Sequence, residues 1–331
     1  MRWIRYEANG QAVYGIVEGD DVTEVRGDPF TGHERTTIRR TLSAVKLLVP
    51  VEPRTFYCAG LNYAEHVIEA ARKRGQEPNL PNAADIGYRA NNALAAHGEP
   101  IVIPADATER VQYEAELVAV IGRKAKHLSE RDALSCVLGW TIGNDVSERT
   151  WQAGDRTLWR AKNADTFKPM GPWIETDFDL DAAQTIVRVN GDEKIRFKTN
   201  SMIFGPATFI SRMSQYLTLY PGDVVWMGTE GAPENIKHGD TVDIEITGIG
   251  TLSNPVVRES RLLRFAGQRS RSLGSRASRS ASPKRLKPNT VSAIARPGKT
   301  AIHGAVEAYS SAPPCSIRPQ AGTGSCTPRP R

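Results

Sequence analysis

The chain has 331 residues, of which 40% are hydrophobic and 24% charged, so it is long enough for one large domain or two ordinary ones with a sizeable core. Its formal net charge of +6 arises in residues 260–331, which hold 14 of the 43 lysines and arginines but one of the 37 acidic residues, Glu307. Residues 1–259 therefore carry 29 basic and 36 acidic side chains, a balance that gives no reason to expect a nucleic-acid-binding surface there.

The pattern along the chain divides it into three parts. Residues 1–50 alternate apolar and polar positions around a turn at Asn9-Gly10, which predicts a small β-rich N-terminal domain. Residues 51–259 form the predicted catalytic domain. Residues 260–331 are rich in Arg, Ser and Pro and lack the apolar residues of a core, so we predict a disordered basic tail. This tail is either an extension without a role or an arm for RNA or a membrane surface.

Strand signals dominate residues 51–259, and regular alternation of strands and helices is absent, which argues against a Rossmann or barrel architecture. We therefore predict a mostly β, α+β fold. Strands are expected over residues 55–60, 101–103, 113–121, 140–146, 185–189, 224–227, 241–246 and 250–257. Helices are expected over residues 63–74, 129–138 and 208–216, the second with Ser129 as N-cap and Asp132 completing a capping box.

Cysteine usage and the N-terminus bear on the cellular compartment. Four cysteines, Cys58, Cys136, Cys315 and Cys326, form no CxxC pair, which excludes the usual zinc and thioredoxin-type motifs. The first 22 residues lack the apolar core of a signal peptide, and no apolar run approaches the length of a membrane span. We therefore expect a reduced, cytoplasmic protein without a membrane partner.

Three carboxylates occur where apolar strands begin or end. Glu114 and Glu116 would face the same side of a strand, and Asp145 follows the apolar run 138–144. Neighbouring carboxylates in a buried place repel each other, so a cation should lie between them. Because no Cys or His lies nearby, the set favours a hard ion, Mg²⁺, Mn²⁺ or Ca²⁺. The alternative is a group of solvated acids at strand ends.

Three further positions suggest chemistry. His66 and Glu69 are neighbours on the predicted helix, where the carboxylate can orient the imidazole as a base for water, although a surface ion pair is the simpler interpretation. Lys162 precedes a loop framed by Pro and Gly and either offers its ammonium to an anion or is merely solvated. Thr229 follows a strand at a glycine turn, where a hydroxyl and backbone N–H groups can hold a carboxylate.

Taken together and in this order, these segments resemble the fumarylacetoacetate hydrolase family. The similarity covers residues 54–258 and rests on the runs YCAGLNYAEH, YEAELVAVIGR, GNDVSERTWQ, KNADTFKPMGPW, LYPGDVVWMGT and GDTVDIEITGIGTLSNPV. The resemblance implies a mixed β-sandwich roll, usually a homodimer, preceded by a small N-terminal domain. The implied site consists of metal ligands at Glu114, Glu116 and Asp145, catalytic groups at His66, Glu69 and Lys162, and substrate contacts at Arg149, Gln152 and Thr229.

Two segments depart from the family's pattern. Residues 87–93 stand where many members have Phe-x-Lys-Pro and a Ser-rich loop, and residues 228–234 stand where many have Gly-Thr-Pro-x-Gly-x-Gly. Both segments line the pocket in relatives, so the identity of the substrate is not carried over. Lys168 occupies a place where a small residue is common, and it would add a second lysine to the site.

The sequence thus predicts a Mg²⁺- or Mn²⁺-dependent hydrolase, with Ca²⁺ as a further option, that cleaves a C–C bond in a small 2-oxo or 1,3-diketo acid. The fumarylacetoacetate or acylpyruvate type, as used in aromatic catabolism, is the implied substrate class. His66 would activate water, and Lys162 would neutralise the anionic end of the substrate. The alternatives are an isomerase, decarboxylase or lyase of the same family, such as a muconate-type isomerase or ureidoglycolate lyase, and a non-catalytic binding protein with a basic tail.

Overall fold

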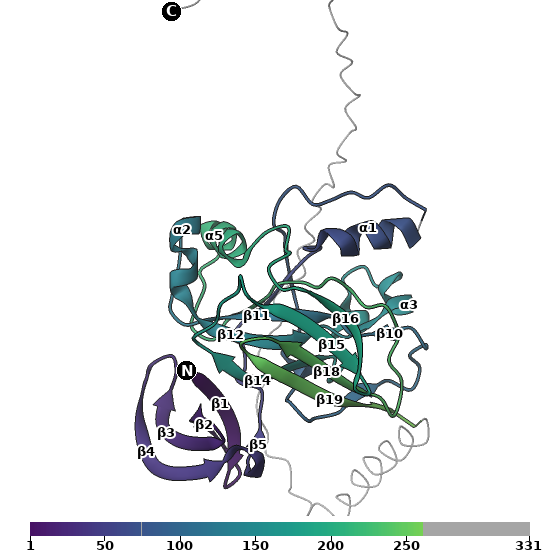
Figure 1. Ribbon diagram of the computed structural model, residues 1–331. Coiled ribbons are helices and arrows are strands. Elements are labelled where there is room, and N and C mark those ends of the chain that lie inside the picture. The colour runs from purple at the N-terminus through teal and green to yellow at the C-terminus, as the bar shows by residue number, and fades with distance from the viewer. Residues whose placement is uncertain (74, 261–331) are drawn as a thin grey trace, which may run out of the picture. The chain divides into compact units, whose positions relative to one another are not determined.

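The computed structural model describes residues 1–73 and 75–260. Except for Ser260, the predicted basic tail lies outside them, as do Cys315 and Cys326. Two main sheets make up most of the described part, with short helices at their margins (Figure 1). The mostly β fold expected from the sequence is confirmed.

The larger sheet has twelve strands in the order β4-β3-β2-β1-β14-β12-β11-β17-β6-β7, with β5 beside β1 and β8 beside β14. It is mixed, because β17 runs parallel to β6 and β14 runs parallel to β8, whereas the other neighbours are antiparallel. Its strands are β1 Arg2–Ala8, β2 Gln11–Glu18, β3 Asp21–Asp28, β4 Gly32–Thr41, β5 Lys46–Leu47, β6 Phe56–Ala59, β7 Ile86–Tyr88, β8 Leu94–Ala95, β11 Ala115–Ile121, β12 Val137–Asn144, β14 Lys168–Glu175 and β17 Val224–Trp226.

The smaller sheet has five strands in the order β16-β15-β18-β19-β9, and β10 and β13 form a separate pair. These strands are β9 Ile101–Ile103, β10 Val111–Gln112, β13 Ser147–Glu148, β15 Gln184–Val189, β16 Asp192–Lys198, β18 Thr241–Ile246 and β19 Gly250–Arg258. Apolar side chains from both sheets, including Leu117, Ile142, Val187, Ile244 and Leu252, form one shared core. The two sheets therefore pack as layers around this core.

Strand β11 is buried on both faces, as its unbroken apolar sequence indicates. Leu117 and Ala119 belong to the core shared with the smaller sheet, whereas Val118 and Val120 belong to a second apolar cluster on the other side, which contains Trp226. A polar side chain at the end of this strand is therefore far from bulk water unless a loop opens there. This burial sets the electrostatic conditions for the two glutamates at the N-terminal end of β11.

The helices are short and lie at the ends and edges of the sheets: α1 Ala64–Lys73, α2 Glu130–Ala133, α3 Arg149–Gln152, α4 Trp159–Asn163 and α5 Pro206–Tyr216, with 3₁₀ turns at Leu42–Ala44, Asn91–Ala93 and Leu134–Cys136. The prediction of a helix over residues 129–138 was too long. Ser129 does cap α2 by accepting a hydrogen bond from the Asp132 N–H at 3.3 Å. Strand pairing of Val137 with Ile121 then ends the helical segment, because the sheet ladder outweighs local helical preference.

Two other boundaries differ from the expectation. The strand predicted over residues 113–121 begins two residues later, because Tyr113 and Glu114 lie between β10 and β11 and belong to neither. The segment 76–100, for which neither a strand nor a helix is predicted, contributes β7 and β8 to the larger sheet. Short strands of two or three residues leave too little periodicity to be recognised from sequence alone.

The N-terminal strands continue the larger sheet. Strand β1 pairs antiparallel with β14, placing Arg2 opposite Glu175 and Trp3 opposite Ile174. The Arg2 Nε donates to Glu175 Oε2 at 3.0 Å, and the N-terminal ammonium donates to Oε1 at 2.9 Å. Strands β1, β2 and β3 also have an apolar cluster of their own, made by Ile4, Tyr6, Ala8, Val17 and Val22. The first 50 residues are therefore joined to the rest by backbone hydrogen bonds.

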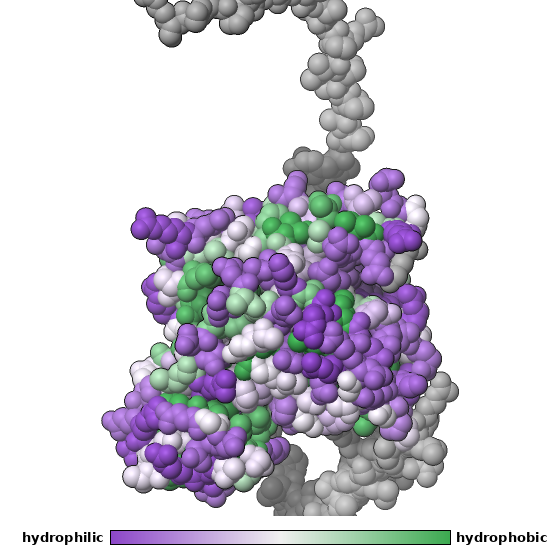
Figure 2. Space-filling view, viewed as in Figure 1, coloured by the Kyte–Doolittle hydropathy of each residue, from purple (hydrophilic) through white to green (hydrophobic). Residues whose placement is uncertain are grey.

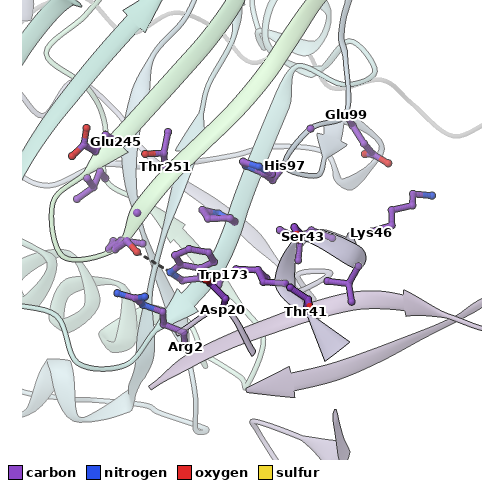
Figure 3. A pocket seen from close by; sticks show the side chains of 18 of the residues that line it. Arg2, Asp20, Thr41, Ser43, Lys46, His97, Glu99, Trp173, Glu245 and Thr251 are labelled. Atoms are coloured by element: carbon purple, nitrogen blue, oxygen red, sulfur yellow. Dashed lines mark hydrogen bonds between the residues drawn. The ribbon is translucent and has the colours of Figure 1, made fainter. Parts of the chain in front are cut away.

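A cleft of about 1100 Å³ lies where the N-terminal strands meet the turn between β18 and β19 (Figure 3). The Arg2 guanidinium lies 5.3 Å from the centre of the Trp173 ring, and Trp173 Nε1 donates to the Ile249 carbonyl at 2.8 Å. None of the three predicted metal ligands lines this cleft.

Hydrophilic residues cover most of the face drawn in Figure 2, and the apolar areas between them are scattered. Within the described ranges, no helix combines the length and the apolar character needed to cross a membrane.

Replacement of Gly143 by alanine should destabilise the protein by about 1–3 kcal/mol. Gly143 faces the ring of Trp226, and a Cβ at residue 143 would lie 2.6 Å from the ring atom Cζ3. Because Trp226 is fully buried, its ring cannot shift to relieve this contact. A urea unfolding curve measures the effect. Gly154→Ala is the matched control, because the nearest atom to its Cβ is 3.8 Å away. An unchanged midpoint for Gly143→Ala would contradict this packing.

Candidate functional site

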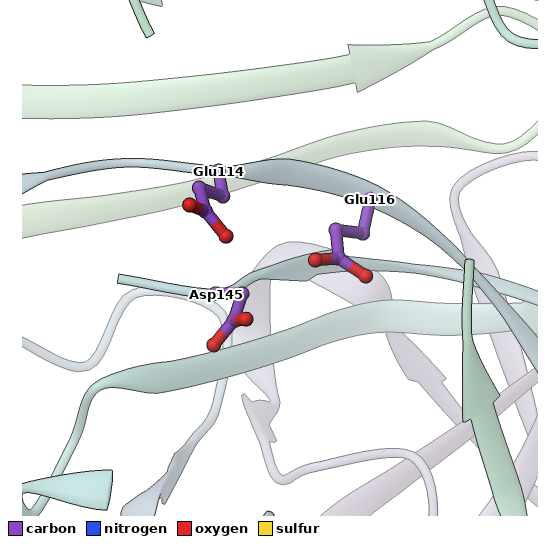
Figure 4. A group of neighbouring side chains, drawn as sticks. All are labelled: Glu114, Glu116 and Asp145. Atoms are coloured by element: carbon purple, nitrogen blue, oxygen red, sulfur yellow. The ribbon is translucent and has the colours of Figure 1, made fainter. Parts of the chain in front are cut away.

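The three predicted carboxylates converge (Figure 4). Glu114 lies one residue before β11, Glu116 is the second residue of that strand, and Asp145 directly follows β12. The register of β11 and β12 pairs Glu116 with Gly143, and the Asp145 N–H donates to the Glu114 carbonyl at 2.9 Å. One side-chain oxygen from each acid lies within 4.8 Å of the others, and all three side chains are buried.

Lys162 and Arg149 neutralise Glu114. Lys162 lies in α4, and its Nζ is 2.5 Å from Glu114 Oε2 and 2.9 Å from Asp145 Oδ2. The Arg149 Nη1, at the start of α3, is 2.7 Å from Glu114 Oε1. The predicted lysine and the predicted substrate-contacting arginine are thus brought into the carboxylate cluster itself.

Asp145 receives the most positive charge. Arg89 binds it through two nitrogens, with Nε 3.2 Å from Oδ1 and Nη2 2.8 Å from Oδ2. Lys168, which begins β14, places its Nζ 2.6 Å from Oδ1 and is fully buried. Lys168 was predicted as a second lysine of the site, whereas Arg89 was not among the predicted site residues. The only signal was that Arg89 lies in the segment 87–93, which departs from the family's pattern.

These charges separate the behaviour of the two glutamates. Burial opposes ionisation of Glu114, but the charges of Lys162 and Arg149 outweigh it and lower its pKa to about 2. Burial, reinforced by the charges of Asp145 and Glu114, raises the pKa of Glu116 to about 8. No ion pair within residues 1–73 and 75–260 involves Glu116, and it accepts a hydrogen bond from the Gly228 N–H at 2.8 Å. Glu116 is therefore a buried carboxylate that lacks a cationic partner among the described side chains.

The other charged groups follow the same physics. Burial opposes ionisation of Asp145, but Arg89, Lys162 and Lys168 together hold its pKa well below the ordinary value. Burial lowers the pKa of Lys168 to about 8, although Asp145 acts in the opposite direction. Four cations thus surround three carboxylates, and their charges are concentrated around Asp145 and Glu114 rather than Glu116.

His66 approaches the cluster from α1. Asn62, which precedes this helix, anchors it to the rest of the domain. Its Nδ2 donates to the Met227 carbonyl at 2.8 Å and to the Phe204 carbonyl at 3.1 Å. A Cβ at Gly231 would lie 2.5 Å from His66 Nδ1, and Gly231 has a φ of +110°, so the loop can pass this close to the imidazole only as glycine.

Burial lowers the pKa of His66, while the charges of Glu114 and, more weakly, Glu69 oppose this change. His66 is half-buried, whereas Glu69 is exposed one helical turn later. A lowered pKa keeps the imidazole neutral at neutral pH, which is the form that can accept a proton.

Gln152 and Thr229 lie beside the same groups. Arg149 Nη1 donates to Gln152 Oε1 at 2.9 Å, and its Nε donates to Gln112 Oε1 at 2.7 Å, so the guanidinium is held from both sides. Thr229 is buried, and its Oγ1 accepts from the Gly231 N–H at 3.2 Å. The loop 228–231 therefore contacts Glu116 through Gly228 and His66 through Gly231.

The donor set fits a hard divalent cation. Two oxygens on opposite sides of such an ion are about 4–5 Å apart, which is similar to the spacing of the three carboxylate oxygens. The carboxylate without a cationic partner, Glu116, is the one whose ionisation an added positive charge would favour most. The buried acidic triad is thus consistent with a divalent-metal site, and it lacks the Cys or His ligands that zinc or copper prefers.

Comparison with known proteins identifies relatives both among curated sequences and among solved structures. Protein Rv2993c of Mycobacterium tuberculosis is 41% identical over 241 residues, which is 72% of this chain and 88% of that protein. The crystal structure of 5-carboxymethyl-2-hydroxymuconate delta-isomerase from Mycobacterium smegmatis superposes with a TM-score of 0.70 at 38% identity, covering 78% of this chain and all of that one. The mitochondrial oxaloacetate tautomerase fahd2 of Xenopus laevis is 36% identical over 229 residues, which is 65% of this chain and 69% of that protein.

Two family profiles match along the chain. Residues 1–50 match the profile described as Rv2993c-like, N-terminal, and residues 55–257 match fumarylacetoacetate (FAA) hydrolase C-terminal. The second match spans the carboxylate triad, the cations around it and the helix with His66. The profile match, the sequence identity and the structural similarity agree, and together they cover most of the described residues. The chain therefore belongs to the fumarylacetoacetate hydrolase family.

Proposed function

We propose that this protein is a divalent-metal-dependent isomerase or tautomerase that interconverts the keto and enol forms of a small 2-oxo dicarboxylate. The observation that carries the proposal is the buried triad of Glu114, Glu116 and Asp145 within a ring of cations. Such a site suits a substrate whose reaction builds negative charge on oxygen. Relatives more than a third identical in sequence are named as an isomerase and a tautomerase, which favours this chemistry over hydrolysis.

The relatives' names support an isomerase or tautomerase more than the hydrolase that the sequence predicts. Cleavage of a C–C bond by water and tautomerisation both pass through an enolate, so the same acidic triad serves either reaction. They differ in the atom that gives up a proton, which is oxygen of water in one case and carbon of the substrate in the other. The names of the relatives favour the second reaction, and no specific feature of the site supports the decarboxylase or lyase alternatives.

Glu114, Glu116 and Asp145 would hold the metal, Mg²⁺ or Mn²⁺, with Ca²⁺ as a further option. When bound, the ion would act as a Lewis acid that stabilises the developing charge on an enolate oxygen. Two of these ligands are already ionised by their cationic neighbours, whereas Glu116 has to lose its proton when the ion binds.

The cations give the site an excess of positive charge. Four basic side chains face three carboxylates, and a divalent ion would add two further charges. This excess suits a substrate with two carboxylates. Arg149, held by Gln152, and Lys162 would take one substrate carboxylate, and Thr229 with its glycine-rich loop would offer a hydroxyl to the other.

His66 would move the proton. Its imidazole is neutral at neutral pH because burial lowers its pKa. It can therefore take a proton from the substrate carbon next to the carbonyl and deliver it to the enolate oxygen. Glu69, one turn along α1, would orient the helix end and the imidazole. Closure of this segment over the substrate would exclude water and suppress hydrolysis.

The proposal is tested by incubating purified protein with oxaloacetate and following the conversion of enol to keto form by ultraviolet absorbance, with Mg²⁺ or Mn²⁺ and after chelation. We expect conversion that needs the metal. The comparison reaction is release of pyruvate from an acylpyruvate, followed by a coupled dehydrogenase. Rapid pyruvate release without tautomerisation would overturn the proposal and restore the hydrolase.

His66→Ala should lower kcat by about 10²–10⁴ and leave metal affinity unchanged, because it removes the base and none of the proposed ligands. In the wild type, kcat/KM should fall as the pH drops through a pKa below 6.5, since protonation of His66 removes the base and its pKa lies below that ordinary value. The exposed Glu65→Gln on the same helix is the control. An acid limb that persists in His66→Ala with full activity would remove His66 from this role.

Glu116→Gln should abolish Mn²⁺ binding in a calorimetric titration. The substitution removes the one proposed ligand that has no ion pair with a described side chain. The metal-free wild type should also lose stability between pH 6.5 and about 8. The raised pKa means that folded Glu116 keeps its proton where the unfolded chain releases it, so the stabilisation is lost as the pH rises through the folded value. Glu116→Gln should show a smaller decline in urea unfolding. Equal declines in both proteins would argue against a buried, uncompensated carboxylate.

A further inference from the structure

Lys168 is the most deeply buried cation of the site. It begins β14, its side chain is fully buried, and Met170 two residues later pairs with Gly143 of β12. Its Nζ donates to the Val146 carbonyl at 3.0 Å and the Phe167 carbonyl at 2.8 Å, and lies 2.6 Å from Asp145 Oδ1. An ammonium has three hydrogens to donate, and all three therefore have acceptors.

Asp145 is saturated by these contacts. Its Oδ1 is approached by Lys168 and by Nε of Arg89, and its Oδ2 by Lys162 and by Nη2 of Arg89. A carboxylate offers about four lone-pair positions, and four donors occupy them. A metal ion can therefore bind Asp145 only where one of these donors gives way.

The three cations differ in how easily they can give way. Arg89 is held by a two-point contact to Asp145, and Lys162 is shared with Glu114. Lys168 makes a single contact to Asp145 and has two carbonyls that can keep its ammonium hydrogen-bonded when that contact is broken. It is also a like charge that a divalent ion at Asp145 would face among buried side chains, where repulsion is screened least.

We propose that Lys168 is an internal competitor of the divalent metal, holding Asp145 in place when the ion is absent and weakening the affinity for the ion. This inference rests on the proposed metal site and adds a residue that sets its affinity. The site is thereby assembled before the metal arrives, and occupancy follows the free metal concentration.

Calorimetric titration with Mn²⁺ tests the proposal on the full-length chain. Lys168→Met removes the charge at similar length, and Lys168→Gln removes it while keeping donors for the two carbonyls. Both should bind Mn²⁺ at least tenfold more tightly than the wild type. Lys46→Met, which removes an exposed charge in β5 that pairs with Glu7, is the matched control and should bind as the wild type does.

The outcomes separate this inference from the proposed function. Wild-type affinity in both folded Lys168 variants would overturn the competition while leaving the metal site intact. Absence of Mn²⁺ binding by the wild type and both variants would overturn the metal site itself, and the competition with it. Should the variants fail to fold, wild-type crystals soaked in Mn²⁺ decide: movement of Lys168 Nζ away from Asp145 supports the proposal, and an ion bound to Asp145 with that contact kept overturns it.

Discussion

The burial of three carboxylates at the ends of two adjacent strands is the constraint on which the rest of the site depends. Burying an ionised carboxylate without a partner would cost more free energy in desolvation than the fold can offset. The protein must therefore place positive charges beside these acids. Arg89, Lys162 and Lys168 meet Asp145, and Arg149 with Lys162 meets Glu114. Among the described residues, Glu116 is left with one backbone N–H as a partner, and this imbalance would favour an added cation on its side of the cluster.

The sheet makes this arrangement possible. Antiparallel pairing of β11 with β12 sets Glu116 beside Gly143, and the absence of a side chain at Gly143 lets the Trp226 ring pack over β12 on the same face of the sheet as Glu116. The carboxylates thus project from a rigid, close-packed support, whereas His66 and the loop 228–231 come from outside the sheet. Ligands on packed strands, with a base on a helix outside the sheet, suit an enzyme that must admit and release a small substrate.

Membership of a family named for hydrolysis does not decide the reaction. The acid triad and the cations serve any reaction that passes through an enolate, so the outcome depends on whether water or a substrate carbon reaches the base. The relatives named as an isomerase and a tautomerase favour carbon. In the proposed function the excess of positive charge, to which Lys168 contributes, would favour a substrate with two carboxylates, and in the proposed competition it would limit how tightly the metal is held.

The sequence by itself determined the mostly β fold, the family and the three acids, because alternating and unbroken apolar runs, together with charges placed inside them, are local signals. It also indicated that a cation must lie near Glu114 and Glu116, since two buried carboxylates repel. The resemblance also pointed to Lys162, Arg149 and Lys168, but only the tertiary structure decided which carboxylate each cation meets. Arg89 is 56 residues from Asp145 along the chain, and its own segment is marked only by its departure from the family's pattern. The saturation of Asp145 and the isolation of Glu116 are likewise properties of distances between strands, loops and helices, which local sequence patterns do not encode.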